Sequence, residues 1–373
     1  MRNLGIHWLV VLVTFLGVNL HTSAAAGPIV IGQSLPLSGA GFPAANRVLA
    51  GARAQVERIN VSGGVLGRAL ELVTLDDGGD PQRVAANLRV LARQHGAIAI
   101  VNCLGERSCV RAAQVSKELR IPLLGPMSGA LQLRKPGINH VFSTRPDDAH
   151  EADTLARQLY VIGISKTIVL ADDSEPARTQ ALISALQRSG QNVTRMDTDA
   201  RPETLAAAFK NMRNSPYQAL VIHLGYDTLQ TLDQMPASTS AGLPVTIATL
   251  SSGGLTQLTR LFRDRVIGYT SVVPSLDITR LPIVRDLQRD ADAFIGPEAL
   301  TFEGLEAYLN LRVCAEALRL AGPNPDGQRL GVAMENLGVL DAGGIRLMFS
   351  PDKHHGSDFV EIGMRTRDGR LLR

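Results

Sequence analysis

Short apolar runs rich in β-branched residues alternate along the chain with longer segments whose apolar residues recur at helical spacing. The strand-like runs cover residues 28–34, 69–75, 97–101, 121–125, 166–171, 219–224 and 244–249. The helix-like segments cover residues 46–60, 82–95, 150–162, 177–189, 203–213 and 303–321. Strands that alternate regularly with helices are typical of parallel sheets with helices on both faces. The pattern therefore predicts an α/β fold built on doubly wound parallel sheets.

The strand-like runs are more numerous than one small doubly wound sheet needs, and the pattern is interrupted near residues 143–148 and 272–277. After the second interruption the chain offers helices and a short tail instead of another complete sheet. We therefore predict two lobes, with more than one crossing of the chain between them. The predicted parts are residues 27–144 and 273–346 for the first lobe, 145–272 for the second, and 347–373 for a C-terminal hinge segment and tail.

The N-terminus carries the marks of a targeting segment. Arg2 precedes an apolar run at residues 8–18, and small residues follow at 23–26. This order is typical of a secretory signal peptide. An uncleaved membrane anchor is the alternative, but the run is shorter than the ~20 apolar residues that cross a bilayer. We predict a signal peptide at residues 1–26 and export of the rest of the chain.

Export bears on the cysteines. The stretch NCLGERSC, residues 102–109, is predicted as a loop and carries Cys103 and Cys109. Their spacing is not that of a CxxC redox pair, and neither a second such pair nor a nearby histidine completes a zinc set. Because disulfides persist outside the cytosol, we predict that the two are bonded to each other. Cys314 falls on the apolar stripe of a helix-like segment, which predicts a buried, unpaired thiol.

Composition and motifs argue against several functional classes. The net charge is only +3, aromatic residues make up 4%, and no basic run is interleaved with aromatics, so nucleic-acid binding is not expected. The glycine motif at 39–44 has a proline where a dinucleotide site needs N–H groups. The acidic stretch at 76–80 indicates a strand end and a helix cap more than a calcium loop. The histidines at 354–355 are predicted to lie in a solvated turn, and we predict no cofactor and no metal.

Ser128 lies in a glycine-containing turn, GPMSGA at 125–130, directly after a strand-like run. Two roles are open to it: the nucleophile of an exported serine hydrolase, or part of a nest of donors that holds an anion. The chain has no GxSxG, HExxH or Walker pattern, and no motif supplies a base for the serine. We therefore favour binding over catalysis.

Several longer stretches resemble the periplasmic solute-binding proteins of ABC importers, in the branch related to leucine/isoleucine/valine receptors. The resemblance is carried by IGQSLPLSG (31–39), GARAQVERINVSGGVLGRALELVTLDDGGDP (51–81), IPLLGPMSGALQLR (121–134) and HVFSTRPDD (140–148). It implies the type I periplasmic binding protein fold, in which crossover hinge strands join two lobes and the ligand is captured in the cleft between them. It also implies a periplasmic location.

The resemblance suggests ligand-binding residues on both sides of that cleft. In the first lobe, Met127, Ser128 and Gly129 match positions that bind an amino acid's α-carboxylate through N–H and hydroxyl groups. Tyr226 matches an aromatic of the second lobe. The acid that usually takes the ligand ammonium aligns near Ser251.

The chain departs from the family's pattern at several cleft positions. Ala44 and Pro176 stand where many members have aromatics, and Glu106 falls near a ligand-binding serine. Glu106 and Arg107 are candidates to contact a charged or polar ligand, with exposure to solvent as the alternative. Asp172 and Asp173 are candidates for the missing acid, with a strand-end cap as the alternative. Branched-chain amino acids are therefore not expected as ligands.

These observations predict a receptor without enzymatic activity. It would capture a small polar solute, amino-acid-like or carboxylate-bearing, and deliver it as a monomer to an inner-membrane ABC permease. A periplasmic ligand-sensing subunit of a membrane signalling receptor is the first alternative. An exported serine hydrolase that uses Ser128 is the second.

Overall fold

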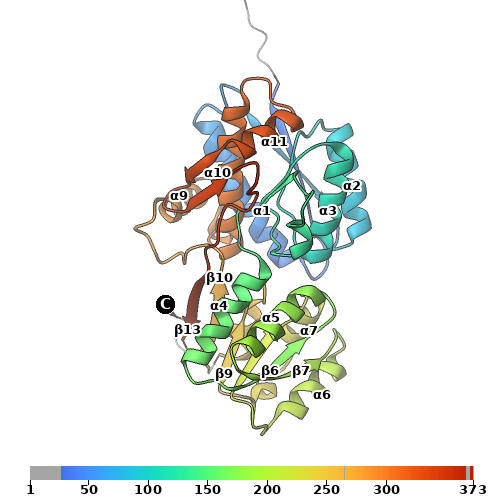
Figure 1. The fold of residues 1–373 in the computed structure, drawn as a ribbon, viewed down its shortest axis with the longest axis vertical. Helices are drawn as coiled ribbons and strands as arrows, with labels where there is room; N and C mark the ends of the chain where they lie inside the picture. Colours follow the sequence, from blue (N-terminus) through green and yellow to red (C-terminus); the bar gives the residue numbers. More distant parts are fainter. Residues whose placement is uncertain (1–26, 264, 367–369, 373) are drawn as a thin grey trace, which may run out of the picture.

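The computed structural model describes residues 27–263, 265–366 and 370–372, so the predicted signal peptide lies outside the described residues. The chain forms two lobes, one above the other in Figure 1, each with its own sheet and its own helices. Within the described ranges, no helix combines the length and the apolar composition needed to span a bilayer.

The first lobe is built on a five-stranded parallel sheet with strand order β2-β1-β3-β4-β5. Its strands are β1 (Ile29–Leu35), β2 (Leu70–Asp76), β3 (Ile100–Val101), β4 (Leu123–Leu124) and β5 (Val141–Phe142). The helices of this lobe are α1 (Phe42–Val61), α2 (Pro81–Arg93), α3 (Glu106–Leu119), α9 (Pro282–Asp290), α10 (Phe302–Ala321) and α11 (Gly327–Glu335). A two-stranded hairpin, β11 (Gly338–Asp341) and β12 (Arg346–Phe349), completes it.

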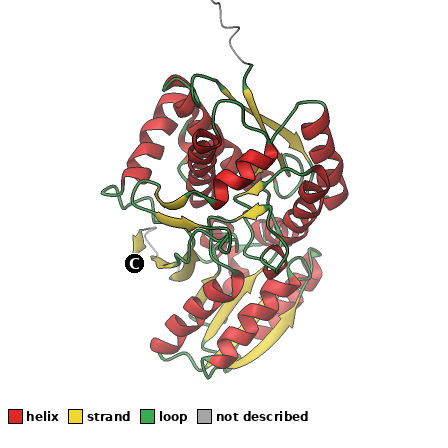
Figure 2. Cartoon of the chain, turned by 45° about the horizontal axis from the view of Figure 1, so that its top comes forward, coloured by secondary structure: helices red, strands yellow, loops and turns green. Residues whose placement is uncertain are grey.

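The second lobe is built on a mixed sheet with strand order β14-β13-β10-β9-β8-β6-β7. Its parallel strands are β6 (Lys166–Ala171), β7 (Asn192–Asp197), β8 (Ala219–His223), β9 (Thr246–Thr249) and β10 (Ile267–Ser271). Antiparallel strands β13 (Glu361–Arg365) and β14 (Leu371–Leu372) extend its edge. Its helices are α4 (Asp148–Val161), α5 (Pro176–Arg188), α6 (Pro202–Met212), α7 (Tyr226–Gln234) and α8 (Leu255–Leu261). Figure 2 shows helices flanking the strands in both lobes.

Three segments connect strands or helices of one lobe with those of the other: residues 143–147, 272–281 and 350–360. The first and third lie side by side, because the N–H of Ser143 donates to His354 O at 2.9 Å and the N–H of Gly356 donates to Ser143 O at 2.7 Å. His354 is buried and stacks on Phe142 with ring centroids 4.3 Å apart. The prediction of a solvated turn at these histidines was therefore wrong, since a ring contact between hinge segments covers His354.

The predicted α/β fold with doubly wound parallel sheets is confirmed, and two local predictions can be checked beside it. Asp80 caps α2, its side chain accepting a hydrogen bond from the N–H of Gln82, and Pro81 opens the helix as predicted. The predicted loop at 102–109 is wrong in its second half, because α3 begins at Glu106. The buried face of α3 consists mainly of alanine, serine and Cys109, so its sequence lacks the stripe of large apolar residues that marks a helix.

The close packing of α1 against α10 in the first lobe depends on two glycines. A β-carbon added to Gly51 on α1 would overlap the backbone oxygen of Gly304 on α10. Because the two helix backbones touch here, any side chain at Gly51 forces them apart and opens the core between them.

This contact leads to a prediction with an internal control. Gly51→Ala is expected to lower the free energy of unfolding by about 1–3 kcal/mol, the usual cost of overpacking. Gly331→Ala on α11 has open space around the new methyl group and is expected to raise it by about 0.5–1 kcal/mol through helix propensity. Urea unfolding of both variants measures the difference. Equal shifts in the two variants would contradict the role given to the α1–α10 contact.

Candidate functional site

A cavity of about 550 Å³ lies between the lobes, and residues of both lobes line it. Its walls come from the segments that follow β-strands and from α10. Parallel strands of two facing sheets direct their carboxyl-end loops into the space between them. The lining includes Met127, Arg145, Tyr226, Ser251 and Glu306.

A smaller cavity of about 230 Å³ adjoins the first. The two share Leu104, Gly105, Glu175 and Tyr226 in their walls. The smaller one is also lined by the first turn of α3, including Glu106 and its neighbour Arg107. The site is therefore one cleft with a larger and a smaller half.

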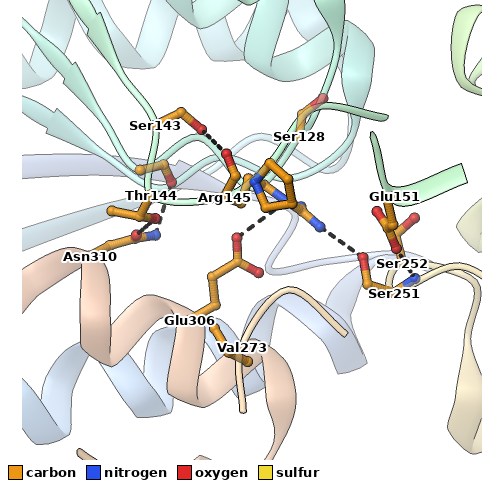
Figure 3. Close-up of polar contacts among 12 residues, drawn as sticks. Ser128, Ser143, Thr144, Arg145, Glu151, Ser251, Ser252, Val273, Glu306 and Asn310 are labelled. Atoms are coloured by element: carbon orange, nitrogen blue, oxygen red, sulfur yellow. Dashed lines mark hydrogen bonds and ion pairs between the residues drawn. The ribbon is translucent and has the colours of Figure 1, made fainter. Parts of the chain in front are cut away.

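Arg145, in the first connection between the lobes, forms part of the floor of the larger half. Its side chain is only 4% exposed, its Nη2 donates to Ser251 Oγ at 2.8 Å, and its Nε lies 3.6 Å from Glu306 Oε1 (Figure 3). Neither of these last two atoms, Arg145 Nε and Glu306 Oε1, has a hydrogen-bond partner. Burial raises the pKa of Glu306, and Arg145 opposes that shift. The arginine thus joins elements of both lobes while keeping hydrogen-bonding capacity toward the cavity.

A chain of buried amides fixes the position of the segment that carries Arg145. Asn310 on α10 donates to Asn102 Oδ1 at 2.9 Å and to Gly125 O at 3.0 Å. Its amide oxygen accepts a hydrogen bond from Thr144, the residue before Arg145 (Figure 3). When every member of a buried polar network has its hydrogen-bond partners, the network fixes a single arrangement of the backbone. The position of Arg145 therefore depends on three other parts of the first lobe: α10 and the ends of β3 and β4.

A second buried arginine, Arg178 on α5, gathers carboxylates beside the cleft. Its guanidinium lies 2.6 Å from Glu151, 3.4 Å from Asp148 and 3.7 Å from Glu175. Burial would raise the pKa of Glu151, but Arg178 and Arg145 outweigh it and lower that pKa to about 2. Burial raises the pKa of Asp148 to about 6, because Arg178 compensates it only in part. Arg178 thus forms ion pairs with three acids.

One of the predicted donors at the turn after β4, the N–H of Met127, is used within the protein, while the Ser128 hydroxyl takes part as an acceptor. The N–H of Met127 donates to Cys103 O at 3.2 Å, and Ser128 Oγ accepts from the N–H of Ala130 at 3.3 Å. Ser128 is buried, and Gly129 packs against Asp148. Of these three residues, only Met127 lines the larger half of the cleft. Their role in binding an anion stays a prediction, and the neighbouring Asp148 carboxylate works against it.

The candidates from the second lobe separate into two groups. Tyr226 lines both halves of the cleft, and burial raises the pKa of its phenol. Ser251 also lines the cleft, and its hydroxyl accepts from Arg145 and from Arg178. Asp172 instead accepts from the N–H groups of Ser174 and Gly225 at 3.0 and 2.9 Å. These bonds tie the ends of β6 and β8 together, as in the cap that was the alternative for Asp172.

The start of α3 makes the contacts that link the lobes across the smaller half. The N–H of Glu106 donates to Glu175 Oε1 at 3.1 Å, and Arg107 donates to the carbonyl of Asp173 at 2.7 Å. The predicted disulfide between Cys103 and Cys109 is present and fastens the first turn of α3 to the strand end before it. Cys314 is buried and unpaired, as predicted.

Tyr226, Ser251 and the first turn of α3 were predicted from the sequence. Arg145, Glu306 and Glu175 were missed. Arg145 could have been found from its position, because it is a charged residue inside a segment predicted to cross between the lobes. Such a segment passes through the cleft. Glu306 gave a weaker signal, because it lies within a long apolar helix where a buried acid needs a partner. Glu175 directly precedes a helix and gave no signal of its own.

The comparisons with known proteins agree on one family. A sequence profile described as "Periplasmic binding protein" matches residues 28–364. An "Amino acid binding protein" of Pseudomonas aeruginosa is 31% identical over 34% of this chain and 33% of its own length. A Leu/Ile/Val-binding protein of Rhizobium johnstonii is 28% identical over 40% of each chain. The aligned region thus spans between a third and two fifths of these relatives.

Solved structures match over almost the whole chain. A possible leucine/isoleucine/valine-binding protein from Rhodopirellula baltica superposes with a TM-score of 0.82 and 24% identity, covering 95% of this chain and 98% of its own. A substrate-binding periplasmic protein from Ralstonia solanacearum gives 0.81 at 25% identity, covering 92% and 99%. At such identities the likeness establishes the two-lobed fold.

The disulfide supports a prediction about both stability and the cleft. Replacing Cys103 and Cys109 together with serine is expected to lower the free energy of unfolding by about 2 kcal/mol, the chain-entropy value for so short a loop. It also frees the first turn of α3, so hydrogen exchange at residues 104–107 should accelerate more than exchange in α10. Denaturant unfolding and amide exchange measure the two effects. Unchanged exchange at 104–107 would show that the bond does not position this side of the cleft.

Proposed function

We propose that this chain, which belongs to the periplasmic binding protein family, captures a small polar solute between its two lobes and delivers it to the membrane permease of an ABC importer. Family membership places it at the family level among solute-binding proteins that act in the periplasm. The particular solute and the delivery to a permease are the parts that we propose.

One observation carries the proposal: a cavity of about 550 Å³ lies between the lobes and has charged side chains buried in its walls. Arg145 is the most informative of them, since it contacts Ser251 of the second lobe and Glu306 of the first. Buried charges with open hydrogen-bonding capacity around a cavity are typical of ligand-binding sites.

The proposed solute is amino-acid-like or carboxylate-bearing. A guanidinium offers a planar pair of donors that matches a carboxylate, so Arg145 is the group we assign to the anionic end. This assignment puts Arg145 ahead of the turn at Met127, Ser128 and Gly129 as the main group that binds the anion, because the N–H of Met127 already has a partner and the Asp148 carboxylate lies beside Gly129. Two relatives whose names refer to amino acids support the same class.

Binding drives closure in this proposal through a difference in affinity. Arg145 lies in the first connection, which Thr144 and Asn310 tie to the first lobe, and Tyr226 lies in the second lobe. A solute therefore touches both side chains only when the lobes are close together. A ligand shifts a hinge equilibrium only by the extent to which it prefers one state. The contacts that exist solely in the closed form therefore set the shift.

The arginine can be tested without removing its charge. Arg145→Lys keeps a cation beside Glu306 but loses the paired donors, so affinity for a carboxylate-bearing solute should fall roughly 10- to 150-fold. The solute is the one that gives the largest thermal shift in a screen of amino acids, amides and carboxylates. Calorimetry measures the affinity. Arg188→Lys, an exposed arginine paired with Asp153, serves as the matched control.

The two variants separate binding from stability. Arg188→Lys is expected to bind like the parent protein, and both variants are expected to melt within a few degrees of it. Equal affinity of Arg145→Lys and the parent would remove Arg145 from the site. A screen in which no small solute binds would contradict the proposed function itself.

A further inference from the structure

We infer that the solute carries a positively charged side-chain nitrogen at the end away from its carboxylate, such as an ammonium, guanidinium or amidinium group, and that Glu106 and Glu175 bind it in the smaller half of the cleft. This inference rests on the proposed function, because it names the class of solute that the same cleft accepts. Its basis is independent of the resemblance to known receptors: an excess of buried carboxylates at one place in the cleft.

Glu106 has no cationic partner within the described part of the chain. The residue is 8% exposed and lines the smaller cavity. Its Oε1 accepts a hydrogen bond from Gln132 at 3.3 Å, while its Oε2 has no hydrogen-bond partner. The neighbouring Arg107 is turned to the carbonyl of Asp173. An ionised carboxylate in such surroundings is costly unless a positive charge meets it.

The groups that face Glu106 across the cleft are mostly acids as well. Glu175, at the start of α5, accepts the N–H of Glu106 at 3.1 Å, and Asp148 is at the start of α4. Arg178 is the cation among them, but its shortest contact, at 2.6 Å, is to Glu151. Burial, Glu175 and Asp148, in that order, raise the pKa of Glu106, and Arg178 opposes them. Four carboxylates thus surround Arg178, and Arg145 helps to compensate only two of them, Glu151 and Asp148.

Closure of the cleft brings these carboxylates from the two lobes together. Glu106 belongs to the first lobe and Glu175 to the second, so their repulsion grows as the lobes approach. A cationic group of the solute between them turns this repulsion into attraction and therefore favours the closed form. An anionic group there would increase the repulsion. With Arg145 at the other end of the cleft, the preferred solute carries a carboxylate at one end and a cationic nitrogen at the other.

Isosteric pairs of probes test the inference directly. Arginine and citrulline have similar shapes, as do lysine and 2-aminoheptanoic acid, but only the first of each pair has a charged side-chain nitrogen. Calorimetry at pH 8 should show arginine or lysine binding at least about 10-fold more tightly than its neutral partner. Glu106→Gln should bring this ratio close to one. Glu118→Gln, on the exposed face of the same helix and paired with Arg89, should leave it unchanged.

A second measurement needs no ligand. The raised pKa means that ionised Glu106 destabilises the folded form, so the parent protein loses stability as the pH rises from the ordinary value of 4.5 through the folded-state pKa. Glu106→Gln removes this loss. Its melting temperature at pH 8 should exceed the parent's by about 1–3 °C, and the gap should vanish below about pH 4. Glu118→Gln should show no such gap.

Two outcomes overturn the inference while leaving the proposed function intact. One is a neutral or anionic solute that binds the parent protein at least as tightly as every cationic probe. The other is Glu106→Gln melting at or below the parent's temperature at pH 8, which would show that the carboxylate is compensated within the protein. Absence of binding by all small solutes would overturn the proposed function and the inference with it, and a gain in stability of Glu106→Gln in that case would show only that the carboxylate is uncompensated.

Discussion

Charges buried where the two lobes meet must be compensated, and this requirement explains much of the arrangement around the cleft. The acids involved outnumber the arginines: Glu106, Asp148, Glu151, Glu175 and Glu306 against Arg145 and Arg178. Each arginine is held by groups from more than one element, since a buried guanidinium without partners would be costly. The remaining imbalance lies next to the cavity, where a solute can correct it.

The fold explains why these charges meet. Parallel sheets place the loops after β4, β5, β6 and β9 at facing edges, so residues far apart in sequence converge on one cleft. The first connection between the lobes then carries Arg145 through the middle of it. Thr144 and Asn310 tie this connection to the first lobe, while Ser251 links Arg145 to the second. The hinge and the site are therefore made of neighbouring residues, so a movement of the hinge changes the positions of the site residues.

The overall fold could be predicted from the sequence because periodicity reports which faces are buried. Prediction failed where burial does not involve large apolar residues. The helix α3 buries alanine and serine beside Cys109, and His354 is covered by Phe142 from a strand more than 200 residues earlier. The edge strand β7, with its partly exposed polar residues, was missed for a related reason. In each case the environment is decided by partners that the periodicity within the segment does not report.

The site was harder to predict than the fold, again for a physical reason. The disulfide followed from spacing and export, and Tyr226 followed from the resemblance. Arg145 and Glu306 can be recognised as site residues only once they are seen to face each other, and they are 161 positions apart in the sequence. Likewise, the turn at Ser128 appeared open to an anion until the Asp148 carboxylate was seen to lie against Gly129. Charge compensation is a property of the assembled cleft.

The proposed mechanism depends on a solute that bridges the lobes and thereby holds them together. Spin labels on an exposed position of each lobe, for example Gln94 after α2 and Arg213 after α6, allow the distance between the lobes to be measured by pulsed electron resonance. Titration with a binding solute should convert a broad distribution into a narrower one at shorter distance, with the midpoint equal to the calorimetric dissociation constant. A distribution that stays unchanged at saturating solute would contradict this mechanism.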